Sequence, residues 1–113
     1  MEWERVAAAA DVPEEGTLPV LFRGQPVCLY NIGGRIFATH DTCTHQDASL
    51  ADGFIVDGKI ECPLHQGMFD IATGKALAEP CTVDLKVYLA KVEAGQVLLA
   101  EPGGRDSGGV TQP

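Results

Sequence analysis

The stretch DTCTHQDASLADGFIVDGKIECPLHQG, residues 41–67, contains two short pairs of cysteine and histidine. The first pair is Cys43-Thr44-His45, and the second is Cys62-Pro63-Leu64-His65. Chance alone would rarely place two such pairs in a chain with four cysteines and three histidines. Two thiolates and two neutral imidazoles together suit a metal centre. The stretch therefore predicts a metal site, with Cys43, His45, Cys62 and His65 as its ligands.

Two kinds of metal centre accept this ligand set. Zinc binds two cysteines and two histidines tetrahedrally, but its ligand pairs usually have about two to four residues between them. Cys43 and His45 have one residue between them, which disfavours zinc. A [2Fe–2S] cluster takes the same four ligands, with both cysteines on one iron and both histidines on the other. The spacing favours the cluster, and a zinc-binding interaction module is the alternative; colour separates them, because a zinc protein is colourless.

Outside this stretch the chain consists of short apolar and β-branched runs that are broken by turn residues. The pair Gly33-Gly34 accepts positive φ at both positions, so it predicts a tight hairpin, and Ala94-Gly95 predicts a second one. Ala7–Ala10 is expected to form one helical turn that ends before Pro13. The expected strands are Trp3–Val6, Pro19–Phe22, Val27–Ile32, Arg35–His40, Lys59–Glu61, Met68–Ile71, Val87–Lys91 and Val97–Ala100.

These patterns predict an all-β fold, an antiparallel sandwich or open barrel. The loop-rich segment of about residues 41–70 is expected to form a small cluster-binding subdomain on top of the sheet. Residues 1–101 are expected to be one domain. Residues 102–113 are rich in glycine and polar residues and are expected to be a flexible tail.

Composition restricts the partners. Sixteen acidic residues against eight basic ones give a formal net charge of −8, which disfavours nucleic acid and anionic membranes. No apolar run approaches the ~20 residues needed to span a bilayer. The N-terminus lacks the basic start and apolar core of a signal peptide, so we expect a cytoplasmic protein. We also expect a monomer.

The pattern Cys-x-His, sixteen residues, Cys-x-x-His resembles the Rieske signature. The resemblance covers roughly residues 1–101 and is closest to the Rieske ferredoxins of multicomponent aromatic-ring-hydroxylating dioxygenases. It implies a Rieske-like fold with one [2Fe–2S] cluster, held by two loops that each carry one cysteine and one histidine. In that family a third, proline-containing loop covers the cluster, and Glu79-Pro80-Cys81 stands at its place.

The chain departs from the high-potential Rieske proteins of respiratory complexes. The positions of their loop-to-loop disulfide correspond here to Ala48 and Leu64, and their serine and tyrosine hydroxyls to Gly67 and Phe69. Hydrogen bonds to sulfur stabilise the reduced cluster, so their absence predicts a low reduction potential, on the order of −150 mV. Cys28, inside a strand, is expected to be a buried apolar residue and not a ligand. Cys81 is not expected to bind iron either.

The resemblance implies an electron carrier rather than an enzyme. A flavin-dependent NAD(P)H ferredoxin reductase would reduce the cluster. A terminal oxygenase with Rieske and mononuclear non-haem iron centres would receive the electron. The alternatives are a ferredoxin of another multicomponent monooxygenase and a Rieske-like accessory subunit, for example of a nitrite reductase.

The same resemblance suggests where partners approach. His45 and His65 are expected at the tip of the molecule, because the histidine-bound iron accepts the electron. The expected apolar contacts at this tip are Leu64, Met68 and Pro80. The acidic residues expected to steer a basic partner are Asp41, Asp47, Asp52 and Asp57.

Overall fold

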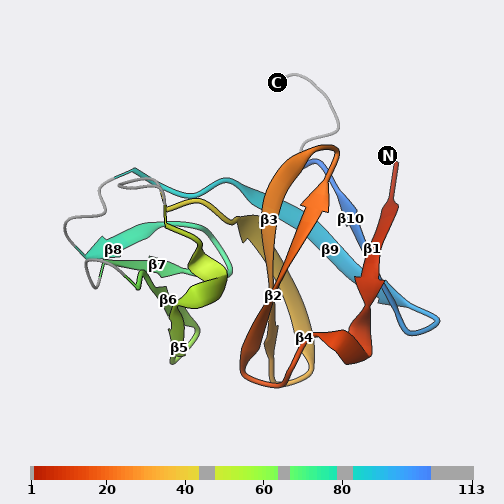
Figure 1. Cartoon of the computed structure of the whole chain (residues 1–113), viewed down its shortest axis with the longest axis horizontal. Helices are drawn as coiled ribbons and strands as arrows, with labels where there is room; N and C mark the ends of the chain where they lie inside the picture. Colours follow the sequence, from red (N-terminus) through yellow and green to blue (C-terminus); the bar gives the residue numbers. More distant parts are fainter. Residues whose placement is uncertain (1, 44–47, 64–66, 79–82, 103–113) are drawn as a thin grey trace.

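The computed structural model describes residues 2–43, 48–63, 67–78 and 83–102, and in these ranges it is built from β-strands and two 3-10 turns (Figure 1). The elements are β1 (Glu4–Ala8), η1 (Ala9–Asp11), β2 (Gly16–Phe22), β3 (Gln25–Ile32), β4 (Arg35–His40), η2 (Leu50–Asp52), β5 (Phe54–Val56), β6 (Lys59–Glu61), β7 (Met68–Asp70), β8 (Ala76–Ala78), β9 (Val87–Glu93) and β10 (Gln96–Ala100). The predicted all-β class is confirmed.

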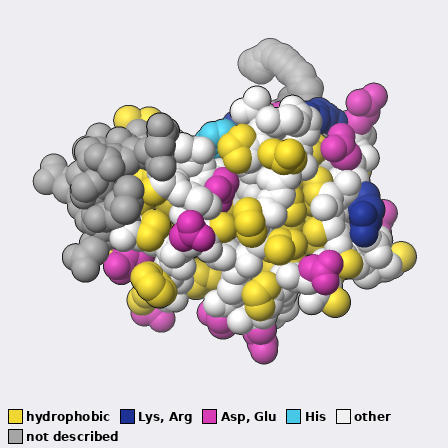
Figure 2. Space-filling model, in the orientation of Figure 1, with side chains coloured by type: hydrophobic (Ala, Val, Ile, Leu, Met, Phe, Trp, Pro, Cys, Tyr) yellow, Lys and Arg dark blue, Asp and Glu magenta, His cyan; other side chains and the backbone are white. Residues whose placement is uncertain are grey.

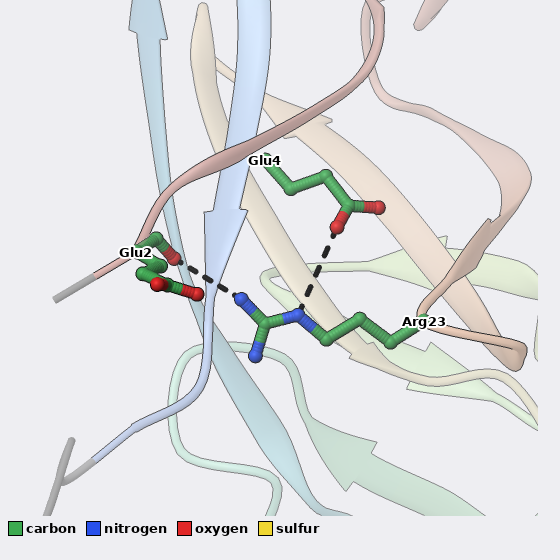
Figure 3. Close-up of polar contacts among 3 residues, drawn as sticks. All are labelled: Glu2, Glu4 and Arg23. Carbon is green, nitrogen blue, oxygen red and sulfur yellow. Dashed lines mark hydrogen bonds and ion pairs between the residues drawn. The ribbon is translucent and has the colours of Figure 1, made fainter.

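Six of the strands form one antiparallel sheet in the order β1-β10-β9-β4-β3-β2. The sheet curls until its two edge strands approach each other, and Arg23, just after β2, connects them (Figure 3). Its guanidinium donates to the carbonyl oxygen of Glu2 at 3.4 Å, and its Nε lies 3.8 Å from a carboxylate oxygen of Glu4. These exposed contacts stabilise little, but they show that the sheet is a nearly closed barrel.

The other four strands form a second antiparallel sheet in the order β5-β6-β7-β8. It lies beside the barrel, at the left in Figure 1, and is connected to it through the segments that leave β4 and enter β9. The part of the chain predicted as mainly loops therefore contains short strands, and this small sheet continues to Ala78.

Strand β3 connects the two halves because both of its faces are buried. Val27 and Leu29 point into the barrel core, whereas Cys28 and Tyr30 belong to a second core beneath the small sheet. Successive side chains of a strand point to opposite faces, so a continuous buried run from Val27 to Tyr30 serves two cores at once. This strand fixes the position of the small sheet on the barrel.

In the part of the chain that the structure describes, four two-residue hairpin turns have positive φ at both positions, as a type I′ turn requires. Gly33-Gly34, with φ of 61° and 88°, and Ala94-Gly95, with 50° and 78°, confirm the two predicted hairpins. Arg23-Gly24 joins β2 to β3, and Asp57-Gly58 joins β5 to β6. These last two turns were not predicted.

Several predicted boundaries were wrong. Ala7 and Ala8 extend β1, opposite Val97 and Gln96, so the predicted helical turn Ala7–Ala10 is replaced by the 3-10 turn Ala9–Asp11. A bulge between Arg5 and Ala7 interrupts the alternation there and hides the strand pattern. Strands β5 and β8 were not predicted, because the turn signal of Asp57-Gly58 after β5 was missed and Ala76–Ala78 has no local strand signal. No helix among the described residues is long and apolar enough to cross a membrane.

Candidate metal centre

The first predicted ligand loop begins at Cys43, three residues after β4 ends. Its base is a bridge between Thr42 and Ser49. The backbone N–H of Cys43 donates to the carbonyl oxygen of Ala48 at 2.9 Å. The chain therefore leaves at Cys43 and returns at Ala48, with four residues between them, His45 included.

The second predicted ligand loop repeats this arrangement on the small sheet. Its base is the pair Glu61 and Met68, where β6 and β7 meet. The backbone N–H of Cys62 donates to the carbonyl oxygen of Gly67 at 2.7 Å. The two loops thus have the same length and the same closing bond, and each has its cysteine at the first position.

The two cysteines are buried in one core. Cys43 is 4% exposed and Cys62 is 1% exposed. Both belong to the apolar core beneath the small sheet, whose other buried members are Cys28, Tyr30, Ala48, Leu50, Ile60, Phe69, Ile71 and Leu85. A thiolate in such surroundings needs a cation to compensate its charge, and a metal ligand has one.

The Asp41 side chain makes hydrogen bonds to the residues that follow the first loop. Asp41 is 7% exposed, and its carboxylate accepts a hydrogen bond from Ser49 Oγ at 2.6 Å and one from the Ala51 backbone N–H at 3.0 Å. This burial corrects the prediction that Asp41 steers a partner. Of the other three predicted steering residues, Asp52 and Asp57 are exposed, and Asp47 lies outside the described residues.

Two hydrogen bonds join the residues before the predicted covering loop to the residues after it. Before it, Gly74 accepts a hydrogen bond from the Leu85 N–H at 2.7 Å, and the Ala76 N–H donates to the Asp84 carboxylate at 2.9 Å. Residues on both sides of the segment 79–82 are therefore tied together. Glu79, Pro80 and Cys81 themselves lie outside the described residues.

The structure places only part of the predicted site. His45, His65 and Leu64 lie outside the described residues, so the complete ligand set remains a prediction. Within the described part of the chain no cluster of three or more potential metal ligands occurs. Phe69 is fully buried and Ala48 is buried in the same core.

Cys28 is the third cysteine in this core, and it confirms the prediction of a buried apolar residue. Its side chain is fully buried. Burial raises the pKa of its thiol to about 12, against the partial lowering effect of a hydrogen bond from Tyr30. The thiol therefore stays protonated at neutral pH, unlike a thiolate ligand.

The sequence of the chain matches a known protein family. Residues 2–89 match the family described as the Rieske [2Fe-2S] domain. The chain belongs to the Rieske family. Membership means one Rieske-type [2Fe–2S] cluster, and the donor chemistry fits: two buried cysteines at equivalent loop positions, each with a histidine in the same loop.

Curated Rieske relatives are close in sequence and in length. The chain is 45% identical over 97 residues to the ferredoxin component of the naphthalene 1,2-dioxygenase/salicylate 5-hydroxylase systems of Ralstonia sp., covering 86% of this chain and 93% of that protein. It is 47% identical, with the same coverage, to the ferredoxin component of the 2,4-dinitrotoluene dioxygenase system of Burkholderia sp. strain RASC. These Rieske proteins are ferredoxin components, that is, electron-transfer subunits.

A solved structure agrees with the fold. The chain superposes with a TM-score of 0.80 and 40% identity on one chain of a complex of reduced oxygenase and oxidized ferredoxin in carbazole 1,9a-dioxygenase. The match covers 87% of this chain and 92% of that one. The Rieske-like architecture expected from the sequence is therefore confirmed.

Proposed function

We propose that this chain carries single electrons from a flavin-dependent NAD(P)H ferredoxin reductase to a terminal aromatic-ring-hydroxylating oxygenase. The observation that carries the proposal is the pair of matched loops, each opened by a buried cysteine and closed by a backbone bond from that cysteine. Relatives that match nearly the whole chain are ferredoxin components of dioxygenase systems, which supports this role. The reductase partner, the monomeric state and the cytoplasmic location stay predictions.

The proposed ligands are Cys43, His45, Cys62 and His65. The cluster they hold supplies a site that accepts and releases one electron. The two cysteines lie in the apolar core, which excludes water from their side of the site. The histidines follow them in the same loops, and we propose that their rings form the side that a partner approaches.

Substitution of single residues tests the ligand set. Changing Cys43 or Cys62 to serine, or His45 or His65 to alanine, should abolish the Rieske electron paramagnetic resonance signal of the dithionite-reduced protein. The double variant with Cys28 and Cys81 changed to serine is the matched control, and it should keep iron, sulfide and signal. If the double variant folds, by circular dichroism, and lacks the cluster, the proposed ligand set is wrong.

Reconstitution tests the role. The purified protein should restore NAD(P)H-dependent oxidation of an aromatic substrate to a mixture of a ferredoxin reductase and an aromatic-ring oxygenase from the same source. Each component omitted in turn should stop the reaction. A chain that carries the cluster but never accelerates oxygenase turnover would contradict the proposed role while leaving the ligand set intact.

A further inference from the structure

Asp41 is the one buried acidic residue in the described part of the chain. Four hydrogen bonds connect it to its surroundings. Its two carboxylate oxygens accept from Ser49 and Ala51, its N–H donates to the Pro26 carbonyl at 3.0 Å, and its carbonyl accepts from the Leu50 N–H at 2.8 Å. Ser49 lies at the bridge where the first loop returns, Leu50 and Ala51 lie in the following 3-10 turn η2, and Pro26 lies on β3.

The second loop has no comparable side chain among the described residues. There, the regular pairing of β6 with β7 continues up to the base of the loop. The first loop has only the single bridge between Thr42 and Ser49 at its base. The second loop is therefore held in place by strand pairing, and the first loop by the hydrogen bonds of the Asp41 side chain.

The position of this carboxylate also has an electrostatic consequence. Asp41 precedes Cys43 by two residues and is shielded from water, so its charge acts through a medium that screens poorly. Reduction adds negative charge to the site that Cys43 helps to form. A buried negative charge nearby opposes that addition and lowers the reduction potential.

We propose that Asp41 is a positioning residue of the metal centre, which fixes the first ligand loop and lowers the potential of the cluster. This inference rests on the proposed assignment of Cys43 and His45 as ligands. Residues that orient metal ligands and carry charge near them are known to tune metal sites in this way.

Asp41→Asn tests the charge with little change of shape. The amide oxygen can still accept from the Ala51 N–H, and the amide N–H₂ can donate to Ser49 Oγ. Asp70→Asn is the matched control, because the half-exposed Asp70 carboxylate also accepts two hydrogen bonds, from the N–H and Oγ1 of Thr73, and its loss changes the net charge equally. We expect Asp41→Asn to raise the midpoint potential in a redox titration, and by more than Asp70→Asn does. No rise, or an equal rise in both variants, would overturn the electrostatic part.

Ser49→Ala tests the positioning without touching the charge. It removes one donor to the carboxylate, so iron should be released to a chelator roughly fivefold faster than from the wild type. Thr73→Ala removes the corresponding donor to Asp70 and should leave the rate unchanged. Equal rates for Ser49→Ala and the wild type would overturn the positioning part. A wild-type protein without a Rieske signal would instead contradict the proposed ligand set, so the two failures are distinguishable.

Discussion

Phe69 is fully buried in the same core as Cys43 and Cys62, and the sequence resemblance implies that it stands where high-potential Rieske proteins carry a tyrosine. Phe69→Tyr should raise the midpoint potential, because a hydroxyl that donates to sulfur stabilises the reduced cluster. Phe37→Tyr is the control, since Phe37 packs against the same core from a half-buried position on β4. Redox titration of both variants is the measurement. An unchanged potential in Phe69→Tyr would contradict the prediction that the missing hydroxyl lowers the potential.

Cys28 makes stability depend on alkaline pH. Burial raises the pKa of its thiol from 9.0 to about 12, so between these values the unfolded chain loses the proton while the folded chain keeps it. Stability should therefore fall as pH rises from about 9, by roughly 1.4 kcal/mol per pH unit from this group. Its neighbours Tyr30 and Asp41 face the same region, and the pKa of Tyr30 is also raised by burial.

The contribution of the Cys28 thiol can be isolated with Cys28→Ser, which keeps a similar shape and does not titrate. The apparent melting temperature of this variant should fall less between pH 8 and pH 11 than that of the wild type. Parallel curves for the two proteins would mean that the Cys28 thiol does not contribute to the pH dependence.

At the scale of elements, Gly74 connects the small sheet to the segment that leads into β9. Its φ is +78°, and an added Cβ would collide with the Leu85 carbonyl oxygen and with Val87 at 2.9 Å. Gly95 has the same φ in an open hairpin turn, where a Cβ would meet nothing. Gly95→Ala should cost about 1 kcal/mol, from backbone strain alone. Gly74→Ala should cost clearly more, because two backbone segments must also separate.

Thermal unfolding of Gly74→Ala and Gly95→Ala measures this difference. We also expect Gly74→Ala to release iron faster, since the Leu85 to Gly74 bond holds the ends of the segment that contains Pro80. If both variants melt at the same temperature, the contact between Gly74 and Leu85 contributes nothing beyond the strain of a positive φ.

Hairpins could be predicted from the sequence better than the shortest strands. Glycine pairs predicted the hairpins at Gly33-Gly34 and Ala94-Gly95 because the requirement for positive φ is local. Asp57-Gly58 carries an equally good signal, which could have revealed β5 and β6 as a hairpin. Strand β8 had no such signal, because Ala76–Ala78 becomes a strand only through pairing with β7.

The candidate site also has a part that the sequence predicts and a part that depends on the fold. Its cysteine and histidine pairs are visible as spacing, whereas the common closing bond of the two loops depends on the partners that the fold brings to each cysteine. The role of Asp41 could not be predicted either. An aspartate in a loop usually indicates a solvated residue, and only the folded chain surrounds this carboxylate with Ser49, Ala51 and the barrel.

At the scale of the whole molecule, the chain carries a net charge of −8. On the face shown in Figure 2, acidic side chains occur over both the small sheet and the barrel, whereas the most prominent basic ones lie over the barrel. Asp52 and Asp57 are exposed beside the small sheet, close in sequence to the exposed side chains of Phe54 and Val56. Exposed apolar side chains with acidic neighbours in the sequence suit a partner that presents basic residues. Asp41 does not contribute to this surface, because it is buried.

Steering by these charges can be tested with two equivalent acids. Asp52 ends the 3-10 turn η2 beside the small sheet, and Asp11 ends the 3-10 turn η1 at the lower end of the barrel in Figure 1. Both are exposed, so Asp52→Lys and Asp11→Lys change the net charge equally in similar backbone settings. Exposed charges act over about 8 Å at physiological salt, which makes the position of the charge decisive.

With a cognate reductase in stopped-flow experiments, rising ionic strength should slow reduction of the wild type, mainly through the association rate. Asp52→Lys should slow it at low salt more than Asp11→Lys does. If the two variants behave alike, only the net charge matters, and if neither salt nor substitution changes the rate, recognition depends on apolar contact instead.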